Sequence, residues 1–364
     1  HEAQPNTKRT FGASCFAYSP QEGEFATAEL KLIRLWQKGD TISHAFTAHD
    51  DNIECLAYSD CGQVLASGSH DNTVKLWRKI GPPEILIGHE KAIMCLLYLS
   101  DYREFVSGSM DKTIRLWREG DSEAYKVLSG HKSWVNCLAY SEKSQEIASG
   151  STDGTIRLWR KAEDSSYQEL TGHKNAICCL AYSPNGKHLA SGSDDKTIRI
   201  WSQDRKKPQT LAGHYSTVRC LAYSSSGDKL ASGSADGTVR LWESQTGRSL
   251  QTITLGWEIY ALQWYLGHLA IAGRDTDNFF IMQHVVYQYV DTKPQLVDTL
   301  HRESANFERP FERISIEKSK GLTESRYRFL KNQGATGKPL FFAKSQNKSD
   351  YENNNLRNGS SVTL

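Results

Sequence analysis

The sequence predicts an all-β protein made of repeated small sheets, on the evidence of a long internal repeat, short apolar runs and regularly placed turn residues. In a chain of 364 residues, five His residues are each followed 28 residues later by a Trp. The copies recur every 40 to 42 residues, and the cleanest runs from Gly130 to Trp159 as GHKSWVNCLAYSEKSQEIASGSTDGTIRLW. A small sheet cannot bury both of its faces alone, so neighbouring copies must stack on one another.

Each copy contains several short runs that are typical of strands. In the cleanest copy these are 137–141 (CLAYS), 147–151 (IASGS) and 155–159 (TIRLW), which are rich in β-branched or aromatic residues. The turn pair Asp153-Gly154 separates the last two runs. Every strong copy repeats this arrangement, so one four-stranded unit is expected for each period.

The period, the Gly-His start and the Trp end resemble the WD40 family, whose units are four-stranded blades of a β-propeller. Two weaker copies flank the five strong ones. Residues 12–36 keep Cys15, Tyr18 and Trp36 in register but lack the His and the turn Asp, and residues 256–282 have Trp257 in place of the His. The resemblance therefore implies a seven-bladed WD40-type β-propeller with a C-terminal extension. Its blades are expected near residues 12–48, 49–88, 89–130, 131–172, 173–213, 214–255 and 256–300.

The propeller is expected to occupy residues 1–300, and the remainder differs in composition. Residues 287–290 and 295–300 are predicted to form a hairpin that completes the last blade from its own chain. Residues 301–364 contain 12 Lys and Arg against 7 Asp and Glu, which makes this tail basic (+5), whereas residues 1–300 carry −3. The last 20 residues are rich in Asn and Ser, so the tail is predicted to be polar, basic and partly disordered.

Recurring His, Ser and Asp resemble a catalytic triad, but five identical triads are not expected in one enzyme. In the WD40 family such residues form a structural chain of hydrogen bonds from Trp to Ser to His to Asp, which satisfies buried polar groups. Transferred by position, the sets are Trp77, Ser67, His49 and Asp71; Trp117, Ser107, His89 and Asp111; Trp159, Ser149, His131 and Asp153; Trp201, Ser191, His173 and Asp195; and Trp242, Ser232, His214 and Asp236. We therefore expect no catalytic residue, and the first blade, with Ala26 and Leu30, to lack the set.

Charge and cysteine use exclude several classes of protein. The net charge is only +2, and the Arg or Lys two residues before each Trp is expected to pack along its blade, so no nucleic-acid partner is predicted. Six of eight cysteines occupy one repeat position, as small buried hydrophobes do, and no pair has zinc spacing, so neither a metal nor a cofactor is expected. No segment is apolar enough to cross a bilayer. We expect a cytoplasmic or otherwise reducing location, neither secreted nor transmembrane, and a monomer.

The resemblance also indicates where a partner binds, namely the narrow face around the central channel. Three positions in each blade tend to point there: the third and fifth residues after the His, and the residue before the turn Asp. They are Asn52, Glu54 and His70; Ala92, Met94 and Met110; Trp134, Asn136 and Thr152; Ala176, Cys178 and Asp194; Thr217, Arg219 and Ala235; with Gly12, Ser14 and Glu29, and Glu258, Tyr260 and Arg274, from the weaker copies. The predicted protein-binding residues are Trp134, Met94, Met110, Asn136, Glu54, His70, Arg219, Tyr260 and Asp194. Among these, Met94, Met110 and Trp134 are expected to form an exposed apolar patch.

The leading functional hypothesis is a non-catalytic scaffold or adaptor that binds a protein or peptide on the narrow face. One alternative is a substrate receptor of a ubiquitin ligase, although propellers of that type often carry Trp-Asp-x-Arg and no copy here has Asp after the Trp. Another is the sensor propeller of a larger signalling ATPase or kinase, although no phosphate-binding loop or kinase signature is present in these residues.

Overall fold

The chain folds into antiparallel sheets of four consecutive strands each. The computed structural model describes residues 15–19, 24–37, 44–99, 103–161, 166–202, 207–265, 268–274, 280–290, 293–300, 320–322 and 341–342, and these residues contain strands and turns but no helix. The prediction of an all-β fold of repeated four-stranded units is therefore confirmed.

Within the described residues, each four-stranded sheet is a meander in which every strand pairs with the next along the chain. The first three sheets are β1 (Cys15–Ser19), β2 (Glu24–Glu29), β3 (Leu32–Gln37) and β4 (His44–Thr47); β5 (Ile53–Tyr58), β6 (Val64–Ser69), β7 (Val74–Arg78) and β8 (Glu84–Leu86); and β9 (Ile93–Leu99), β10 (Glu104–Ser109), β11 (Thr113–Arg118) and β12 (Lys126–Ser129). The fourth and fifth are β13 (Val135–Ser141), β14 (Glu146–Ser151), β15 (Ile156–Arg160) and β16 (Tyr167–Leu170); and β17 (Ile177–Tyr182), β18 (His188–Ser193), β19 (Ile198–Ser202) and β20 (Gln209–Leu211). The sixth and seventh are β21 (Val218–Tyr223), β22 (Lys229–Ser234), β23 (Thr238–Glu243) and β24 (Ser249–Thr254); and β25 (Glu258–Tyr265), β26 (His268–Arg274), β27 (Phe280–Val290) and β28 (Lys293–Leu300).

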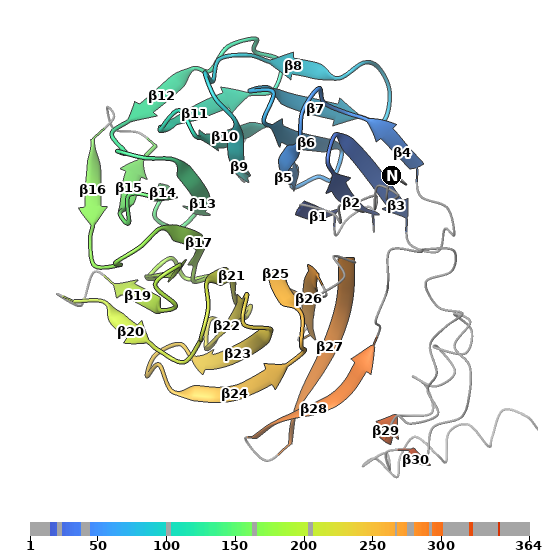
Figure 1. Ribbon diagram of the computed structural model, residues 1–364, viewed down its shortest axis with the longest axis vertical. Helices are drawn as coiled ribbons and strands as arrows, with labels where there is room; N and C mark the ends of the chain where they lie inside the picture. Colours follow the sequence, from blue (N-terminus) through green and yellow to red (C-terminus); the bar gives the residue numbers. More distant parts are fainter. Residues whose placement is uncertain are drawn as a thin grey trace, which may run out of the picture.

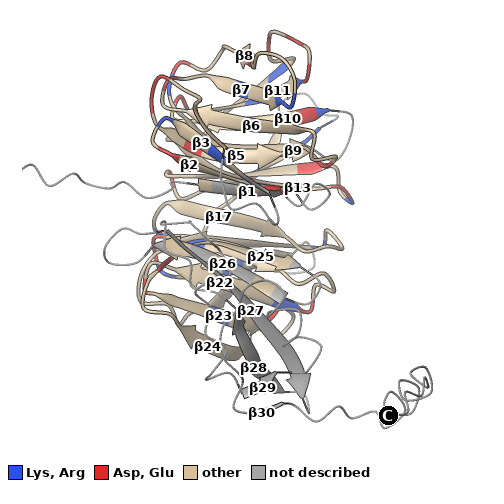
Figure 2. Ribbon diagram, turned by 90° about the vertical axis from the view of Figure 1, so that its right-hand side faces the viewer, with Lys and Arg blue, Asp and Glu red and all other residues tan. Residues whose placement is uncertain are grey.

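The sheets are arranged around a common centre. The first strands of neighbouring sheets pack against each other in chain order, from β1 through β5, β9, β13, β17 and β21 to β25. Figure 1 shows these strands around the middle of the ring, with the fourth strands, such as β8, β16 and β24, at the periphery. Figure 2 shows the ring from the side, where most of the marked charged residues lie at strand ends and in loops.

The core lies between neighbouring sheets. One cluster joins Val74 and Leu76 of the second sheet to Phe105 and Trp117 of the third. All six residues of β6 and of β10 are buried, because other strands or sheets cover both sides of these strands. Their small residues allow this close packing, since a Cβ added at Gly68 would lie 2.5 Å from Cγ2 of Ile93 in the next sheet. Burying a side chain as large as Phe105 or Trp117 stabilises such an interface by about 2 to 3 kcal/mol.

The end of the repeat region agrees with the predicted hairpin. β27 and β28 pair antiparallel, from His284 opposite Leu300 to Val290 opposite Lys293. The hairpin is longer than the sequence indicated, because its pairing already begins at His284 rather than at Tyr287. In the tail, β29 (Lys320–Leu322) and β30 (Phe341–Phe342) form a short parallel pair that was not predicted. The N-terminal segment and the last 20 residues lie outside the described residues.

In the part of the chain that the structure describes, no helix is long and apolar enough to cross a membrane.

Candidate protein-binding face

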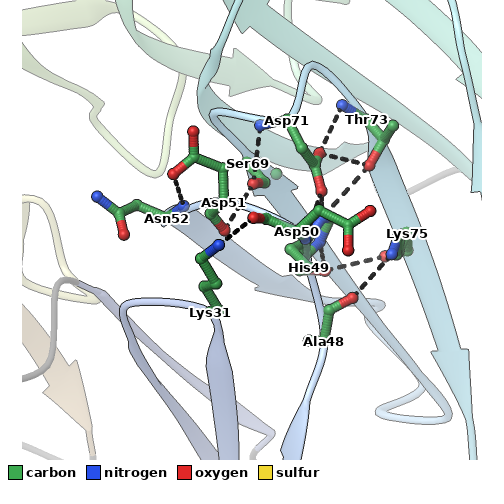
Figure 3. A network of polar contacts seen from close by, with 12 residues as sticks. Lys31, Ala48, His49, Asp50, Asp51, Asn52, Ser69, Asp71, Thr73 and Lys75 are labelled. Carbon is green, nitrogen blue, oxygen red and sulfur yellow. Dashed lines mark hydrogen bonds and ion pairs between the residues drawn. The ribbon is translucent and has the colours of Figure 1, made fainter.

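A polar network joins four side chains of the second sheet. Nε1 of Trp77 donates to Oγ of Ser67 at 2.8 Å, and Ser67 Oγ lies 2.7 Å from Nε2 of His49. Nδ1 of His49 lies 2.8 Å from Oδ2 of Asp71. Asp71 also accepts hydrogen bonds from the hydroxyl of Thr73 at 2.6 Å and from its N–H at 3.0 Å (Figure 3). The network ties the loop between β4 and β5 to the turn between β6 and β7.

The three contacts that join Trp, Ser, His and Asp recur in the third to sixth sheets. In each, the Trp Nε1 to Ser Oγ distance is 2.8 Å, the Ser Oγ to His Nε2 distance is 2.7 or 2.8 Å, and the His Nδ1 to Asp Oδ2 distance is between 2.7 and 3.1 Å. The structure thus brings together all five predicted sets. Each Ser is completely buried and already bonded to Trp and His, so these hydroxyls cannot act as nucleophiles on a bound substrate.

Burial determines the protonation of this network. It lowers the pKa of His49, and the hydrogen bond to Asp71 only partly offsets this effect, so the ring is neutral near pH 7. Burial alone would raise the pKa of Asp71, but hydrogen bonds from Thr73 and His49 bring it down to about 2. The other four His residues also have a lowered pKa, and so do their Asp partners. Each pair is therefore a neutral imidazole beside a carboxylate.

The first sheet lacks the network, as its sequence predicts. The predicted Ser position is wrong by one residue, because Thr27 lies opposite Arg34 as Ser67 lies opposite Lys75, whereas Ala26 lies opposite Leu35. Thr27 is buried at this position, and only Leu30 and Lys31 separate the paired Glu29 and Leu32, so this turn carries no Asp. Backbone bonds take over part of the connection to the next sheet, because Ala48 N–H donates to the Lys31 carbonyl at 2.8 Å and Ile53 N–H donates to the Leu30 carbonyl at 2.8 Å. The Lys31 ammonium donates to the Asp50 carbonyl (Figure 3).

The loops that carry His and the turns that carry Asp lie on one side of the ring, which we call the His–Asp face. Backbone bonds rigidify this face in the same way in five sheets. The residue before each Asp donates its N–H to the carbonyl of the third residue after the His, at 2.8 to 3.0 Å. One such bond joins Thr152 to Trp134. Two of the three positions predicted to contact a partner are therefore held together in every strong repeat.

The remaining predicted position, which is the fifth residue after the His in the strong repeats, is a β-bulge in six of the sheets. The register of the first strand shifts by one residue there, which leaves one residue without a partner on the second strand. The bulged residues are Glu54, Met94, Asn136, Cys178, Arg219 and Tyr260. A bulge redirects a side chain at the end of a strand. The repeat spacing located these positions, but the strand pattern of the sequence contained no signal for the bulge.

Most of the polar candidates on this face are bonded to one another. Nε2 of His70 lies 3.1 Å from Glu54, and Nδ2 of Asn136 donates to Oγ1 of Thr152 at 3.0 Å. In the sixth and seventh sheets, Arg219 lies 3.1 Å from Glu258 and 4.4 Å from the centre of the Tyr260 ring. The Tyr260 hydroxyl donates to the same Glu258 at 2.8 Å.

Asp194 is likewise engaged, because it accepts hydrogen bonds from the Thr217 hydroxyl at 2.7 Å and from the Cys178 thiol at 3.4 Å. Burial is the main cause that raises the pKa of Cys178, and the nearby Asp194 carboxylate adds to it. The pKa reaches about 12, so this thiol stays protonated. Asp194 thus links the fifth sheet to the sixth.

The apolar candidates differ in exposure. Trp134 is 44% exposed, and no aromatic or cation–π partner of its ring is found among the described residues. Met94 and Met110 are half-buried, so they expose a smaller part of their side chains than Trp134 does, and the Met/Trp patch stays a prediction.

Tyr215 belongs to the same face and was not predicted. It follows the His of the sixth sheet and is 79% exposed, while its N–H donates to Asp236 at 2.8 Å. A signal was present in the sequence, because the corresponding residues of the other four strong repeats are all charged: Asp50, Glu90, Lys132 and Lys174.

Three candidates from the weaker copies cannot be placed on the face. Gly12 and Ser14 lie outside the described residues, and the side chain of Arg274 is also outside them. Glu29, from the first sheet, is described and lies 3.5 Å from Arg34. Within the described ranges, no three His, Cys, Asp or Glu side chains gather as metal ligands do.

A family model described as WD domain, G-beta repeat matches residues 40–78, 82–118, 122–160, 164–202 and 205–243, which together make up more than half of the chain. A search of curated proteins found no match. Repeats of this kind generally act as protein-interaction scaffolds and are typically non-catalytic. The matched segments end at Arg78, Arg118, Arg160, Ser202 and Glu243, each one residue beyond the Trp of its network. With five matched repeats and the same hydrogen-bonded network in each, this chain belongs to the WD40-repeat family.

Proposed function

We propose that this chain is a non-catalytic scaffold or adaptor that binds a protein or peptide on its His–Asp face, which corresponds to the predicted narrow face. In this proposal residues 1–300 form one seven-bladed propeller with a sheet in each blade, and residues 301–364 form a basic extension. The seven four-stranded sheets and their circular order support this arrangement (Figure 1).

The observation that carries the proposal is the exposure of Trp134 on a rigid part of this face. A large aromatic side chain that is 44% exposed leaves apolar surface in water, and Trp is among the residues that contribute most to binding interfaces. Its backbone is held by the hydrogen bond from Thr152 at 2.9 Å. A partner would therefore meet an aromatic anchor that needs little further ordering.

The proposal is tested by Trp134→Ser in the full chain, with Ile85→Ser as the matched control. Ile85 lies on the outer strand β8 and is 50% exposed, so both substitutions remove exposed apolar surface. Proteins bound from a lysate of the source cells are identified by mass spectrometry, and the melting temperatures of all three chains are compared. We expect the Trp134 variant to lose partners that the Ile85 variant retains. If both variants retain the same partners with unchanged melting temperatures, binding on this face is refuted.

A further inference from the structure

We propose that the segment bound on the His–Asp face is an acidic peptide with an apolar anchor residue; this inference rests on the proposed function and specifies its partner. The surface concerned spans the third to sixth sheets. It is defined by Trp134 and Tyr215 together with five exposed lysines, and we call it the Lys/aromatic surface. The lysines are Lys91, Lys112, Lys132, Lys174 and Lys196.

The repeat geometry places all five lysines on this face. Lys132 and Lys174 directly follow the network His residues, and their N–H groups donate to Asp153 at 2.8 Å and to Asp195 at 3.0 Å. Lys112 and Lys196 occupy the turns that follow network Asp residues, with φ of 74° and 70°. Lys91 is the second residue after His89. Backbone contacts thus anchor each lysine at the rim, and its ammonium extends into solvent.

These ammonium groups have no carboxylate partner within the described residues. Among the described residues, no ion pair is found for any of the five, in contrast to Arg219 and His70 on the same face, which have carboxylate neighbours. The carboxylates of Asp111, Asp153 and Asp195 lie beneath the lysines, but His, Thr and backbone donors already occupy their oxygens. The accessible layer is therefore cationic, and it can pair with carboxylates of a partner.

The acids on this part of the face do not cancel that charge. On this face of the third to sixth sheets, Glu90 is an exposed acid for which no ion pair is found among the described residues, and Asp194 is bonded to Thr217 and Cys178. The second sheet differs, because Asp50 and Asp51 are exposed at the positions that Lys132 and Ser133 take in the fourth. The charge therefore varies around the ring, and an acidic segment is attracted to the third to fifth sheets and repelled from the second.

The two aromatic residues specify the rest of the ligand. Trp134 directly precedes the first strand of the fourth sheet, and Tyr215 lies in the loop before the first strand of the sixth. The two aromatic residues therefore flank Lys174 and Lys196 of the fifth sheet. Carboxylates alone would leave both rings in water, whereas an apolar side chain between the acids would bury them. A peptide with acidic residues around one aromatic or aliphatic anchor matches this combination. A nucleic acid could also pair with lysines and stack on aromatic rings, and the experiment separates this outcome.

The experiment selects peptides of about 12 residues from a random display library on the intact chain, a length that can cross neighbouring blades. Peptides that bind the wild type and not Trp134→Ser are sequenced. One is labelled, and its affinity is measured by fluorescence anisotropy for wild type and for the double variant Lys132→Glu, Lys174→Glu. The matched control is Lys143→Glu, Lys187→Glu, which reverses two exposed lysines of the same sheets in the turns on the opposite face. All variants must share the wild-type melting temperature.

We expect the selected peptides to be enriched in Asp and Glu around an apolar residue. We also expect the Lys132, Lys174 double variant to weaken binding by about tenfold or more, while the control pair leaves it unchanged. The difference should shrink as salt rises from about 0.05 M to about 0.5 M, because salt screens exposed charges.

Three results would overturn the inference. Peptides that depend on Trp134 but show no acidic enrichment, or no effect of the Lys132, Lys174 reversal, refute the acidic partner and leave the proposed function intact. If no selected peptide depends on Trp134, the proposed function fails as well. An oligothymidine of about 20 nucleotides that binds more tightly than the peptides, and loses binding in the same double variant, identifies the surface as a nucleic-acid site.

Discussion

The ammonium of Lys75 donates a hydrogen bond to the carbonyl of Ala48 at 2.9 Å, and this pair replaces an Arg and a Gly in the other four strong repeats. The residue before the network His is Gly88, Gly130, Gly172 or Gly213 in those repeats, and the matching side chain is Arg115, Arg157, Arg199 or Arg240. A Cβ added at Gly213 would lie 2.9 Å from Nη1 of Arg240 and 3.3 Å from Cη2 of Trp242. The planar guanidinium therefore requires Gly beneath it, whereas the narrower ammonium leaves room for Ala.

The first prediction concerns this pairing. Gly213→Ala should destabilise the fold by about 1 to 3 kcal/mol, because the new methyl group overlaps a guanidinium and a buried indole. The double variant Gly213→Ala, Arg240→Lys should recover much of the loss, since it reproduces the Ala48 and Lys75 pair. Urea denaturation of both single variants and the double variant gives the coupling energy. Additive effects would show that the two positions act independently.

A second prediction concerns the hydrogen-bonded network. Asp153→Ala removes the acceptor used by His131, Thr155 and the Lys132 N–H, so partly buried donors lose their partner. We expect the free energy of unfolding to fall by about 1 to 3 kcal/mol for each donor that stays unsatisfied. Glu142→Ala, an exposed acid in a turn on the opposite face, is the control. Equal stability of the two variants would mean that the network does not stabilise the fold.

The third prediction is a loss of stability in mild acid. The pKa of each of the five network His residues is lowered in the fold by burial, whereas an unfolded His titrates near pH 6.5. Below that pH the unfolded chain binds more protons, so the free energy of unfolding decreases as the pH falls. A second decrease is expected below about pH 4, where unfolded Asp becomes protonated while Asp71, Asp153 and Asp195 keep a pKa of about 2.

Denaturation between about pH 7.5 and pH 5 tests the His contribution. His131→Gln should reduce the pH slope by about one fifth, because one of five equivalent sites no longer titrates. His44→Gln is the control, since His44 is exposed on β4. A slope that is zero in the wild type, or identical in the His131 variant, would contradict the prediction.

A fourth prediction concerns thiol reactivity. All eight cysteines are free, and Cys61 is the exposed one, whereas Cys55, Cys95, Cys137, Cys179 and Cys220 are buried. Burial raises the pKa of these five thiols, and the thiolate is the reactive form. A native chain treated with a thiol reagent such as 5,5′-dithiobis(2-nitrobenzoate) should show a rapid phase that Cys61→Ser removes. Persistence of that phase in Cys61→Ser, and its loss in Cys178→Ser, would place the reactive thiol on the His–Asp face.

Several of these features could be predicted from the sequence because a repeat reports the same local requirement many times. The His and Trp of each copy lie 28 residues apart, and the buried indole, hydroxyl, imidazole and carboxylate that they bring together must satisfy one another. The four-stranded units follow from short β-branched runs separated by turn residues such as Asp153-Gly154. The degenerate first copy was also recognisable, since it has neither the His nor the turn Asp of the network.

The binding face depended on contacts between segments that are far apart in the chain. Arg219 faces Glu258 of the next sheet, and Asp194 meets Thr217 of the next sheet, so these polar candidates are occupied rather than free. Tyr215 was recognised as part of the face only from the exposure of its side chain in the structure.

The sequence by itself therefore determined the fold class, the repeat unit and the residues of the network, because each depends on interactions that recur inside one unit. Only the tertiary structure decided which side chains remain available to a partner. That property depends on how bulges aim the strand ends of six sheets and on which charges neighbouring sheets neutralise, and neither is encoded within a single repeat. Trp134 and the lysines around it were left accessible by this packing.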